Sequence, residues 1–244
     1  MKNICLILEY LGTNYCGFQR QKNGVSIQEV LENTLKEVTG EETKTYPSGR
    51  TDAGVHAMGQ VVNFFTSSTI QPEKFTVVLN LKLPKDIRVK RSFEVDLNFN
   101  ARKSAKQKTY IYKIYTGEVL SAFDQGRCLF CGYKLNLAQM NEACKKLEGE
   151  HDFSAFVASN ATTKTTVRTI YSASLIKEGE YLTFSVTGNG FLYNMVRIIV
   201  GTLIEIGRGK IHLKTLEELL KGGNRTCAGK TVSPDGLYLK EVKY

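Results

Sequence analysis

No stretch of this 244-residue sequence stays apolar over the roughly 20 residues that a membrane-spanning helix requires, so we expect no such helix. The start of the chain also lacks a small-residue cleavage site. Met1 to Asn3 run directly into the apolar residues 4–8 and then Glu9, which favours a first β-strand over a signal peptide. We therefore expect a cytoplasmic protein that does not bind membranes.

Cysteine is sparse, with six residues in the whole chain, a density too low for a disulfide-stabilised secreted scaffold of this length. Cys128 and Cys131 form a single CxxC pair, whereas a structural zinc site needs a second pair of ligands. The three histidines, His56, His151 and His212, are too scattered to suggest a metal triad. The sequence therefore predicts reduced thiols, a CxxC pair that serves as small apolar residues, and no metal.

The sequence also lacks a nucleotide-cofactor loop, because the turn Gly188-Asn189-Gly190 has no third glycine at dinucleotide-binding spacing and no Walker lysine. Positive charge, in contrast, is abundant: 33 Lys and Arg stand against 24 Asp and Glu, a net charge of +9. Residues 82–113 hold ten basic and three acidic residues. The net charge favours a polyanionic partner, with nucleic acid as the leading candidate and an anionic membrane second, while a merely solvated face is the alternative for the local excess at residues 82–113.

The pattern of apolar residues predicts a similar order of elements in each half of the chain. In the first half we expect a strand, a capped helix, two strands, a short helix and a strand, at residues 4–8, 26–40, 43–46, 60–65, 72–83 and 87–95. In the second half we expect strands at 108–115, 166–176, 181–187 and 237–242, and helices at 136–147, 191–206 and 213–220.

These elements predict an α+β protein of two ferredoxin/RRM-like β-α-β-β-α-β halves, whose antiparallel sheets meet around a central basic cleft. The polar run at residues 100–107 separates the halves. We therefore predict an N-terminal domain at residues 1–104 and a C-terminal domain at residues 105–244.

Three features suggest chemistry. Asp52 lies between Gly49 and Gly54 in a predicted loop, where it is a candidate nucleophile or acid/base group, although a capped turn explains the same residues. Arg197 interrupts an apolar helix, so it needs a carboxylate partner such as Asp52 unless it reaches solvent from the helix edge. Tyr110 shares a strand face with another tyrosine beside lysines, as in base-stacking platforms, although ordinary strand packing is the alternative.

Several motifs together closely resemble the TruA family of tRNA pseudouridine synthases. They are GRTDAGVHA at residues 49–57, KTYIY at 108–112, HDF at 151–153, VRTI at 167–170 and GNGFLYNMVR at 188–197. The match runs collinearly from residues 15–19 to residues 236–239. The resemblance implies isomerisation of uridine to pseudouridine at positions 38 to 40 of the tRNA anticodon stem-loop, by a homodimer without metal or organic cofactor.

The resemblance also implies roles for five residues. Asp52 matches the catalytic aspartate that starts cleavage of the glycosidic bond. Tyr110 matches the tyrosine that stacks on the target base, and Arg197 matches the basic residue that pairs with the aspartate. Arg50 resembles the loop arginine that helps to hold the flipped nucleotide, and Leu192 lies in the motif that walls the pocket.

Residues 228–236 depart from the family's usual Ala-Gly-x-Thr-Ala-Pro, and the run at 159–164 is not distinctive. Two other functions stay open: a pseudouridine synthase with an altered RNA target, and a non-catalytic RRM-like RNA-binding protein. A two-carboxylate glycosidic hydrolase is disfavoured, because no clear second acid is present in a comparable motif.

Overall fold

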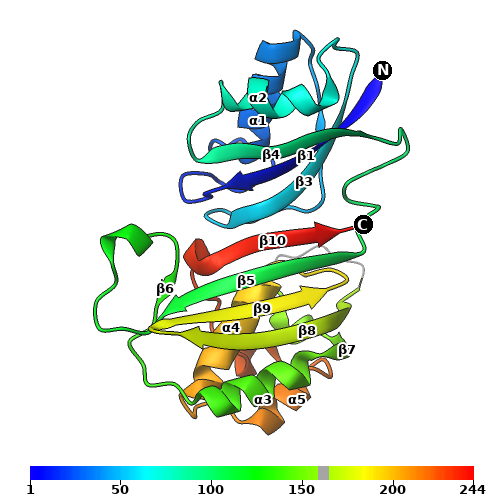
Figure 1. Cartoon of the computed structure of the whole chain (residues 1–244). Coiled ribbons are helices and arrows are strands. Elements are labelled where there is room, and N and C mark those ends of the chain that lie inside the picture. Colours follow the sequence, from blue (N-terminus) through cyan, green and yellow to red (C-terminus); the bar gives the residue numbers. More distant parts are fainter. Residues whose placement is uncertain (159–164) are drawn as a thin grey trace. The chain divides into compact units, whose positions relative to one another are not determined.

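The computed structural model describes residues 1–158 and 165–244, so the run at 159–164 lies outside the described residues. The chain divides into two compact units, which are Met1–Lys106 with Tyr238–Tyr244, and Gln107–Leu237. Both units combine helices with strands that are mostly antiparallel, which confirms the predicted α+β class (Figure 1).

The first unit contains all six elements predicted for the first half of the chain. They are β1 (Lys2–Tyr10), α1 (Ile27–Thr39), β2 (Thr45–Pro47), β3 (His56–Thr66), the short 3-10 turn η1 (Pro72–Lys74) leading into α2 (Phe75–Asn80), and β4 (Ile87–Val95). Strand β1 lies between β3 and β4 and pairs antiparallel with both. Helices α1 and α2 pack together on one face of these strands (Figure 1).

Helix α1 begins and ends where the sequence predicts. The Ser26 hydroxyl accepts a hydrogen bond from the backbone N–H of Glu29 at 3.2 Å and so caps the first turn. Gly40 ends the helix with φ 74°, a left-handed conformation that glycine adopts without a steric penalty. The buried face, which includes Ile27, Leu31 and Leu35, then packs toward the sheet.

The C-terminal strand β10 (Leu237–Lys243) was predicted as a strand, but its partner was not. It pairs in parallel with the start of β3, through Tyr238 with His56 and Leu239 with Ala57. Residues 238–244 therefore belong to the first unit, whereas the sequence analysis placed this strand in the second half. The correction has a simple cause: alternation of apolar residues predicts a strand but carries no information about a partner about 180 residues away.

The second unit holds β5 (Gln107–Tyr115), β6 (Leu129–Phe130), α3 (Leu137–Leu147), β7 (Gly149–Asp152), β8 (Val167–Glu178), β9 (Tyr181–Gly188), α4 (Met195–Gly207) and α5 (Leu213–Leu219). Its strands follow the order β5-β9-β8-β7, and the short β6 pairs with β5. Helix α3 packs against α4 and α5 (Figure 1). Strands β6 and β7 were not predicted, because two to four residues are too few to show a period of two.

Helix α4 is buried along its length except at Arg197 and Glu205. It begins at Met195 rather than near residue 191, because Asn194 adopts a left-handed conformation with φ 60°. The loop after α5 crosses the helix at Gly201, where an added Cβ would overlap the backbone oxygen of Lys230. The backbone N–H of Gly229 also donates to the Thr202 hydroxyl at 2.9 Å, so helix and loop are in direct backbone contact.

None of the described helices is long and apolar enough to cross a bilayer. All six cysteines are free. Cys128 and Cys131 are both buried, and burial raises the pKa of each thiol, which keeps them protonated and poorly reactive. Among residues 1–158 and 165–244, no group of three or more His, Cys, Asp or Glu side chains is placed to hold a metal ion.

Candidate active site

Asp52 lies in the loop at residues 48–55, which joins β2 to β3 in the first unit. Its backbone carbonyl accepts a hydrogen bond from Val55 N at 3.1 Å, which closes a turn with Gly54 at the third position. Gly54 has φ 79°, as a turn of type II requires there. The Asp52 side chain is half-buried, so the loop combines a fixed backbone with a partly accessible carboxylate.

The segment at residues 12–18 packs directly on this loop. The N–H of Phe18 donates to the carbonyl of Thr51 at 3.0 Å. Gly17, with φ 107°, allows this approach, since a Cβ at that position would lie 2.7 Å from the same carbonyl oxygen. The glycine of the motif at residues 15–19 therefore has a structural reason: it lets two backbones meet beside Asp52.

His56 has a structural role that the sequence analysis did not assign. Its side chain is fully buried at the start of β3, and its Nδ1 accepts a hydrogen bond from the N–H of Gly12 at 2.9 Å. The neutral ring therefore carries its proton on Nε2. The ring also stacks on Tyr238, with ring centroids 4.6 Å apart, which ties the end of the loop to β10.

Arg50 lies two residues before Asp52 in the same loop and is exposed. The first unit therefore brings Arg50 and Asp52 together in one loop. The role of Arg50 in holding the flipped nucleotide stays a prediction.

Tyr110 lies on β5 in the second unit, where its side chain is 9% exposed. Its ring meets Phe191 edge to face, with centroids 5.0 Å apart. Tyr112, on the same face, is fully buried and donates its O–H to the carbonyl of Ser233 at 2.7 Å. Tyr112 is thus a core residue that anchors the 233 loop, while the stacking role of Tyr110 stays a prediction.

Arg197 is half-buried at the first turn of α4, and neutral oxygen atoms accept two of its hydrogen bonds. Its Nε donates to the carbonyl of Val232 at 2.8 Å, and its Nη1 donates to the side-chain oxygen of Asn194 at 2.8 Å. The sequence suggested a carboxylate partner or solvent for Arg197. It could not indicate the Val232 carbonyl, because backbone carbonyls leave no trace in a sequence, whereas Asn194 lies only three residues earlier and was overlooked. The expected pairing of Arg197 with Asp52 stays a prediction.

Leu192 lies in the segment that enters α4 and is 7% exposed. Its carbonyl accepts a hydrogen bond from the N–H of Met195 at 3.1 Å, which fixes the chain just before the helix. In the second unit, Tyr110 and Arg197 both contact the segment that leads into α4, to which Leu192 belongs. Arg197 also bonds to the loop at 232–233.

Two further motifs fasten the strands of the second unit. In the turn at residues 188–190, the N–H of Asn189 donates to the carbonyl of Thr169 at 3.0 Å, and the Asn189 side chain accepts from the N–H of Thr169 at 3.1 Å. In the HDF motif, Asp152 accepts a hydrogen bond from the N–H of Ser154 at 2.9 Å. Hydrogen bonds from Thr166 and Ser154 lower the pKa of Asp152, which indicates a structural carboxylate.

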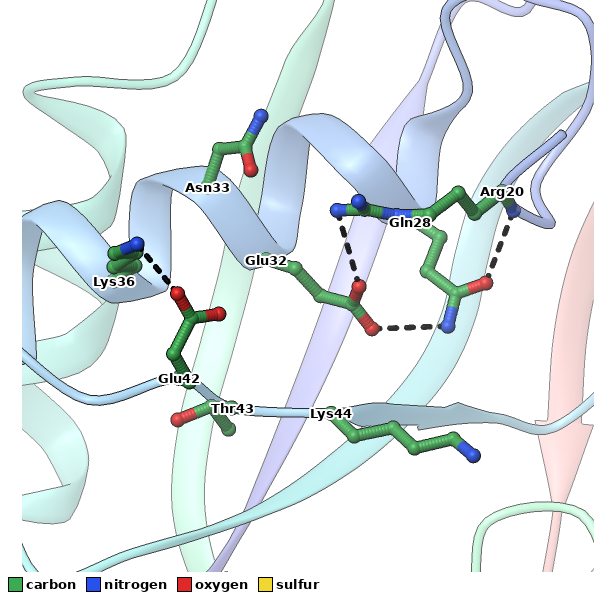
Figure 2. A pocket seen from close by; sticks show the side chains of 8 residues that line it. All are labelled: Arg20, Gln28, Glu32, Asn33, Lys36, Glu42, Thr43 and Lys44. Atoms are coloured by element: carbon green, nitrogen blue, oxygen red, sulfur yellow. Dashed lines mark hydrogen bonds and ion pairs between the residues drawn. The ribbon is translucent and has the colours of Figure 1, made fainter. Parts of the chain in front are cut away.

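A hollow of about 500 Å³ lies beside α1 (Figure 2). Four of its five charged side chains pair with one another, Arg20 with Glu32 at 3.5 Å and Lys36 with Glu42, and the fifth is Lys44. The Glu32 carboxylate also accepts from the N–H of Thr45 at 2.9 Å, so it fastens β2 to α1. None of the five predicted site residues lines the hollow.

The comparison with known families gives a clear result. A family model described as tRNA pseudouridine synthase matches residues 6–102 and 143–244. This chain belongs to the tRNA pseudouridine synthase family. The family is one of isomerases, and its model covers the loop with Asp52 as well as Leu192 and Arg197. Tyr110 lies in the interval between the two matched segments.

Individual tRNA pseudouridine synthases align with this chain over its whole length. The tRNA pseudouridine synthase A of Acetivibrio thermocellus is 47% identical, and those of Caldicellulosiruptor bescii and Clostridium acetobutylicum are 45% and 46% identical, each over 100% of both chains. A chain of the solved Cbf5-Nop10-Gar1 complex aligns with a TM-score of 0.38 and 15% identity over 82% of this chain and 45% of that chain. The family assignment depends on the sequence matches alone.

Proposed function

We propose that this protein isomerises uridine to pseudouridine in the anticodon stem-loop of tRNA, at positions 38, 39 and 40, with Asp52 as the catalytic nucleophile or base. The observation that supports this most strongly is the full-length similarity to tRNA pseudouridine synthases, combined with an aspartate at the first position of a backbone-fixed turn. We further propose that the enzyme is a cytoplasmic homodimer that uses neither a metal nor an organic cofactor.

The reaction places defined demands on these residues. The bond between N1 of uracil and C1′ of the ribose breaks, the base rotates, and C5 bonds to C1′ while the proton on C5 leaves and N1 gains one. Atoms and electrons balance without oxidant, reductant or water. The base must first leave the helical stack, at a cost of a few kcal/mol that contacts with the enzyme offset. The reaction therefore needs a carboxylate that starts the cleavage, a pocket that retains the detached base, and a group that accepts the C5 proton.

We assign base recognition to residues of the second unit. Tyr110 stacks on the target base, and Leu192 forms part of the apolar wall that retains it. The contact between Tyr110 and Phe191 supports this assignment, because an edge-to-face neighbour restricts the orientation of the Tyr110 ring.

We propose that the basic residues of the first unit bind the phosphate backbone of the RNA. Seven of the cations between residues 82 and 106 are exposed: Lys82, Lys85, Lys90, Arg91, Arg102, Lys103 and Lys106. Lys82 and Lys90 form surface ion pairs with Glu37 and Glu9, which are weak and exchange readily for phosphate contacts. Arg50, in the loop with Asp52, holds the flipped nucleotide in this proposal.

The finer architecture predicted from the sequence is also part of the proposal. It comprises two ferredoxin/RRM-like halves, divided near residues 104–106 and with residues 238–244 in the first, whose sheets meet around a basic cleft. The strand order of the first unit supports this for one half, because β4, β1 and β3 are neighbours in that order and β2 lies beside β3.

The function is tested by incubating the purified protein with an unmodified tRNA transcript and mapping pseudouridine with carbodiimide and primer extension. We expect pseudouridine at positions 38 to 40 wherever the tRNA carries uridine there. Tight binding with unchanged uridine would support the RNA-binding alternative instead. Pseudouridine elsewhere would indicate an altered target, and free uracil would indicate hydrolysis.

Arg197→Ala is expected to reduce both stability and activity. The substitution leaves the Val232 carbonyl and the Asn194 side chain without a donor, at a cost of about 1–3 kcal/mol. If Arg197 also pairs with Asp52, the stability changes of Arg197→Ala and Asp52→Asn will not add in a double-mutant cycle measured by urea denaturation. Additive changes, or wild-type turnover in Arg197→Ala, would contradict the pairing.

A further inference from the structure

Four buried polar side chains form a hydrogen-bonded network beneath the loop that carries Asp52. We call them the loop network: Tyr10, Ser48, Thr51 and Gln60. All belong to the first unit, and their exposed fractions are 3%, 0%, 6% and 0%. Gln60 is central. Its Nε2 donates to the carbonyl of Gly49 at 2.9 Å, and its Oε1 accepts from the Ser48 hydroxyl at 2.6 Å.

The chemistry of these groups fixes the direction of the hydrogen bonds made by Gln60. The Gly49 carbonyl can only accept, so the Gln60 amide must turn its NH₂ group toward it. The same NH₂ group lies 3.5 Å from the Tyr10 oxygen, and that oxygen lies 2.8 Å from the Thr51 hydroxyl, where either hydroxyl can donate. Burial raises the pKa of Tyr10 to about 12, so the phenol stays protonated at neutral pH and available to this bond.

The network acts on the backbone immediately before Asp52. Thr51 is held through its hydroxyl by Tyr10 and through its carbonyl by the N–H of Phe18. Gly49 and Ser48 are held by Gln60, on β3. The residues between β2 and β3 form neither helix nor strand, so these bonds supply the support that a regular element would otherwise give.

We propose that Gln60 and Tyr10 are positioning residues for the reaction: they hold the backbone of residues 49–51 so that the Asp52 carboxylate meets the target nucleotide in one fixed geometry. Neither residue is assigned a contact with the reacting atoms. This inference rests on the proposed function of Asp52. Its energetic basis is that a misplacement of about 1 Å in a catalytic group can cost about 100-fold in rate.

The variants Gln60→Met and Tyr10→Phe test the proposal, because each keeps the approximate shape of the side chain and removes its polar atoms. The measurements are the single-turnover rate with saturating tRNA, the Kd for tRNA, and the folded fraction by circular dichroism. We expect a fall in rate per folded molecule of about 10- to 100-fold for Gln60→Met and about 10-fold for Tyr10→Phe. The Kd for tRNA should change much less than the rate, because the exposed basic residues between 82 and 106 that are proposed to bind the RNA backbone lie outside the loop network.

A matched control is available on the same strand. Asn63 is also a fully buried amide of β3, but it bonds to Asn3 at 2.9 Å and to the N–H of Ala101 at 2.9 Å, not to the loop. Asn63→Leu should destabilise the protein and leave the rate per folded molecule unchanged. As a rescue test, Thr51→Ser, which keeps the hydroxyl, should retain more of the rate than Thr51→Val.

The outcomes separate this inference from the proposed function. An equal loss of rate in Asn63→Leu and Gln60→Met would overturn the positioning role, because general destabilisation would explain both. Wild-type rates in Tyr10→Phe, Thr51→Val and Gln60→Met, together with an inactive Asp52→Asn, would overturn the inference and leave the proposed function intact. Full activity in Asp52→Asn would instead overturn the role of Asp52 itself.

Discussion

Asp52→Asn is expected to reduce pseudouridine formation at least about 1,000-fold while folding and tRNA binding persist. The substitution removes the negative charge and the basicity of the side chain but retains its size. The turn at Asp52 depends on the backbone carbonyl and Val55 N, so it should form as before. Carbodiimide mapping of tRNA from a strain that lacks the enzyme, complemented with the wild type or the variant, measures the effect directly.

Asp152→Asn is the matched control for this prediction. Asp152 also lies in a motif of the family resemblance and is partly buried, but its carboxylate caps the N–H of Ser154 within the second unit. We expect a modest loss of stability and full activity per folded molecule. Wild-type pseudouridine levels in Asp52→Asn would show that another group starts the cleavage.

Gly201→Ala is expected to destabilise the protein by roughly 3 kcal/mol or more, despite the better helix propensity of alanine. The new Cβ would overlap the carbonyl oxygen of Lys230, a backbone atom that cannot rotate away. The loop would have to lift from α4, which breaks the bond from Gly229 to Thr202 and the bond from Arg197 to Val232. Calorimetry should show a fall in Tm of about 6–12 °C for a chain of this size.

Gly207→Ala provides the comparison on the same helix. There the added Cβ meets chiefly the side chain of Met140, whose flexible thioether can move aside. Gly207 is the last residue of α4, so alanine gains less helix propensity there than at Gly201, and a larger loss of stability at Gly201 therefore reports the clash with the backbone. Equal Tm values for Gly201→Ala and Gly207→Ala would contradict a rigid contact between α4 and the loop.

The sequence allowed prediction of those parts of the fold whose signals are local. The cap at Ser26 and the stop at Gly40 each depend on neighbours within four residues, and α1 begins and ends accordingly. The start of α4 could not be predicted in this way. Residues 191–194 are as apolar as the helix itself, and the left-handed conformation of Asn194 is set by its place in the fold.

The candidate site could be predicted to a similar extent. A compact loop with glycines on both sides of Asp52 pointed to a functional segment, and the structure gives that segment a defined turn. The loop network was missed, although a glutamine within the apolar strand β3 was a usable signal: a fully buried amide must be hydrogen-bonded. The Val232 carbonyl that accepts from Arg197 gave no signal, because backbone carbonyls are present at every position, whereas the other acceptor, the Asn194 side chain, was readable three residues earlier.

The pairing of β3 with β10 bears on how the chain folds during synthesis. The start of β3, with His56 against Tyr238, acquires this neighbour only after the ribosome has made the whole of Gln107–Leu237. Contacts of such long sequence separation form late, because the cost of closing the loop precedes any gain. A nascent chain can therefore fold β1, α1 and β4 early, while the segment that follows Asp52 forms its contacts with β10 last. This order delays the last contact of the segment that follows the Asp52 loop until the second unit has been synthesised.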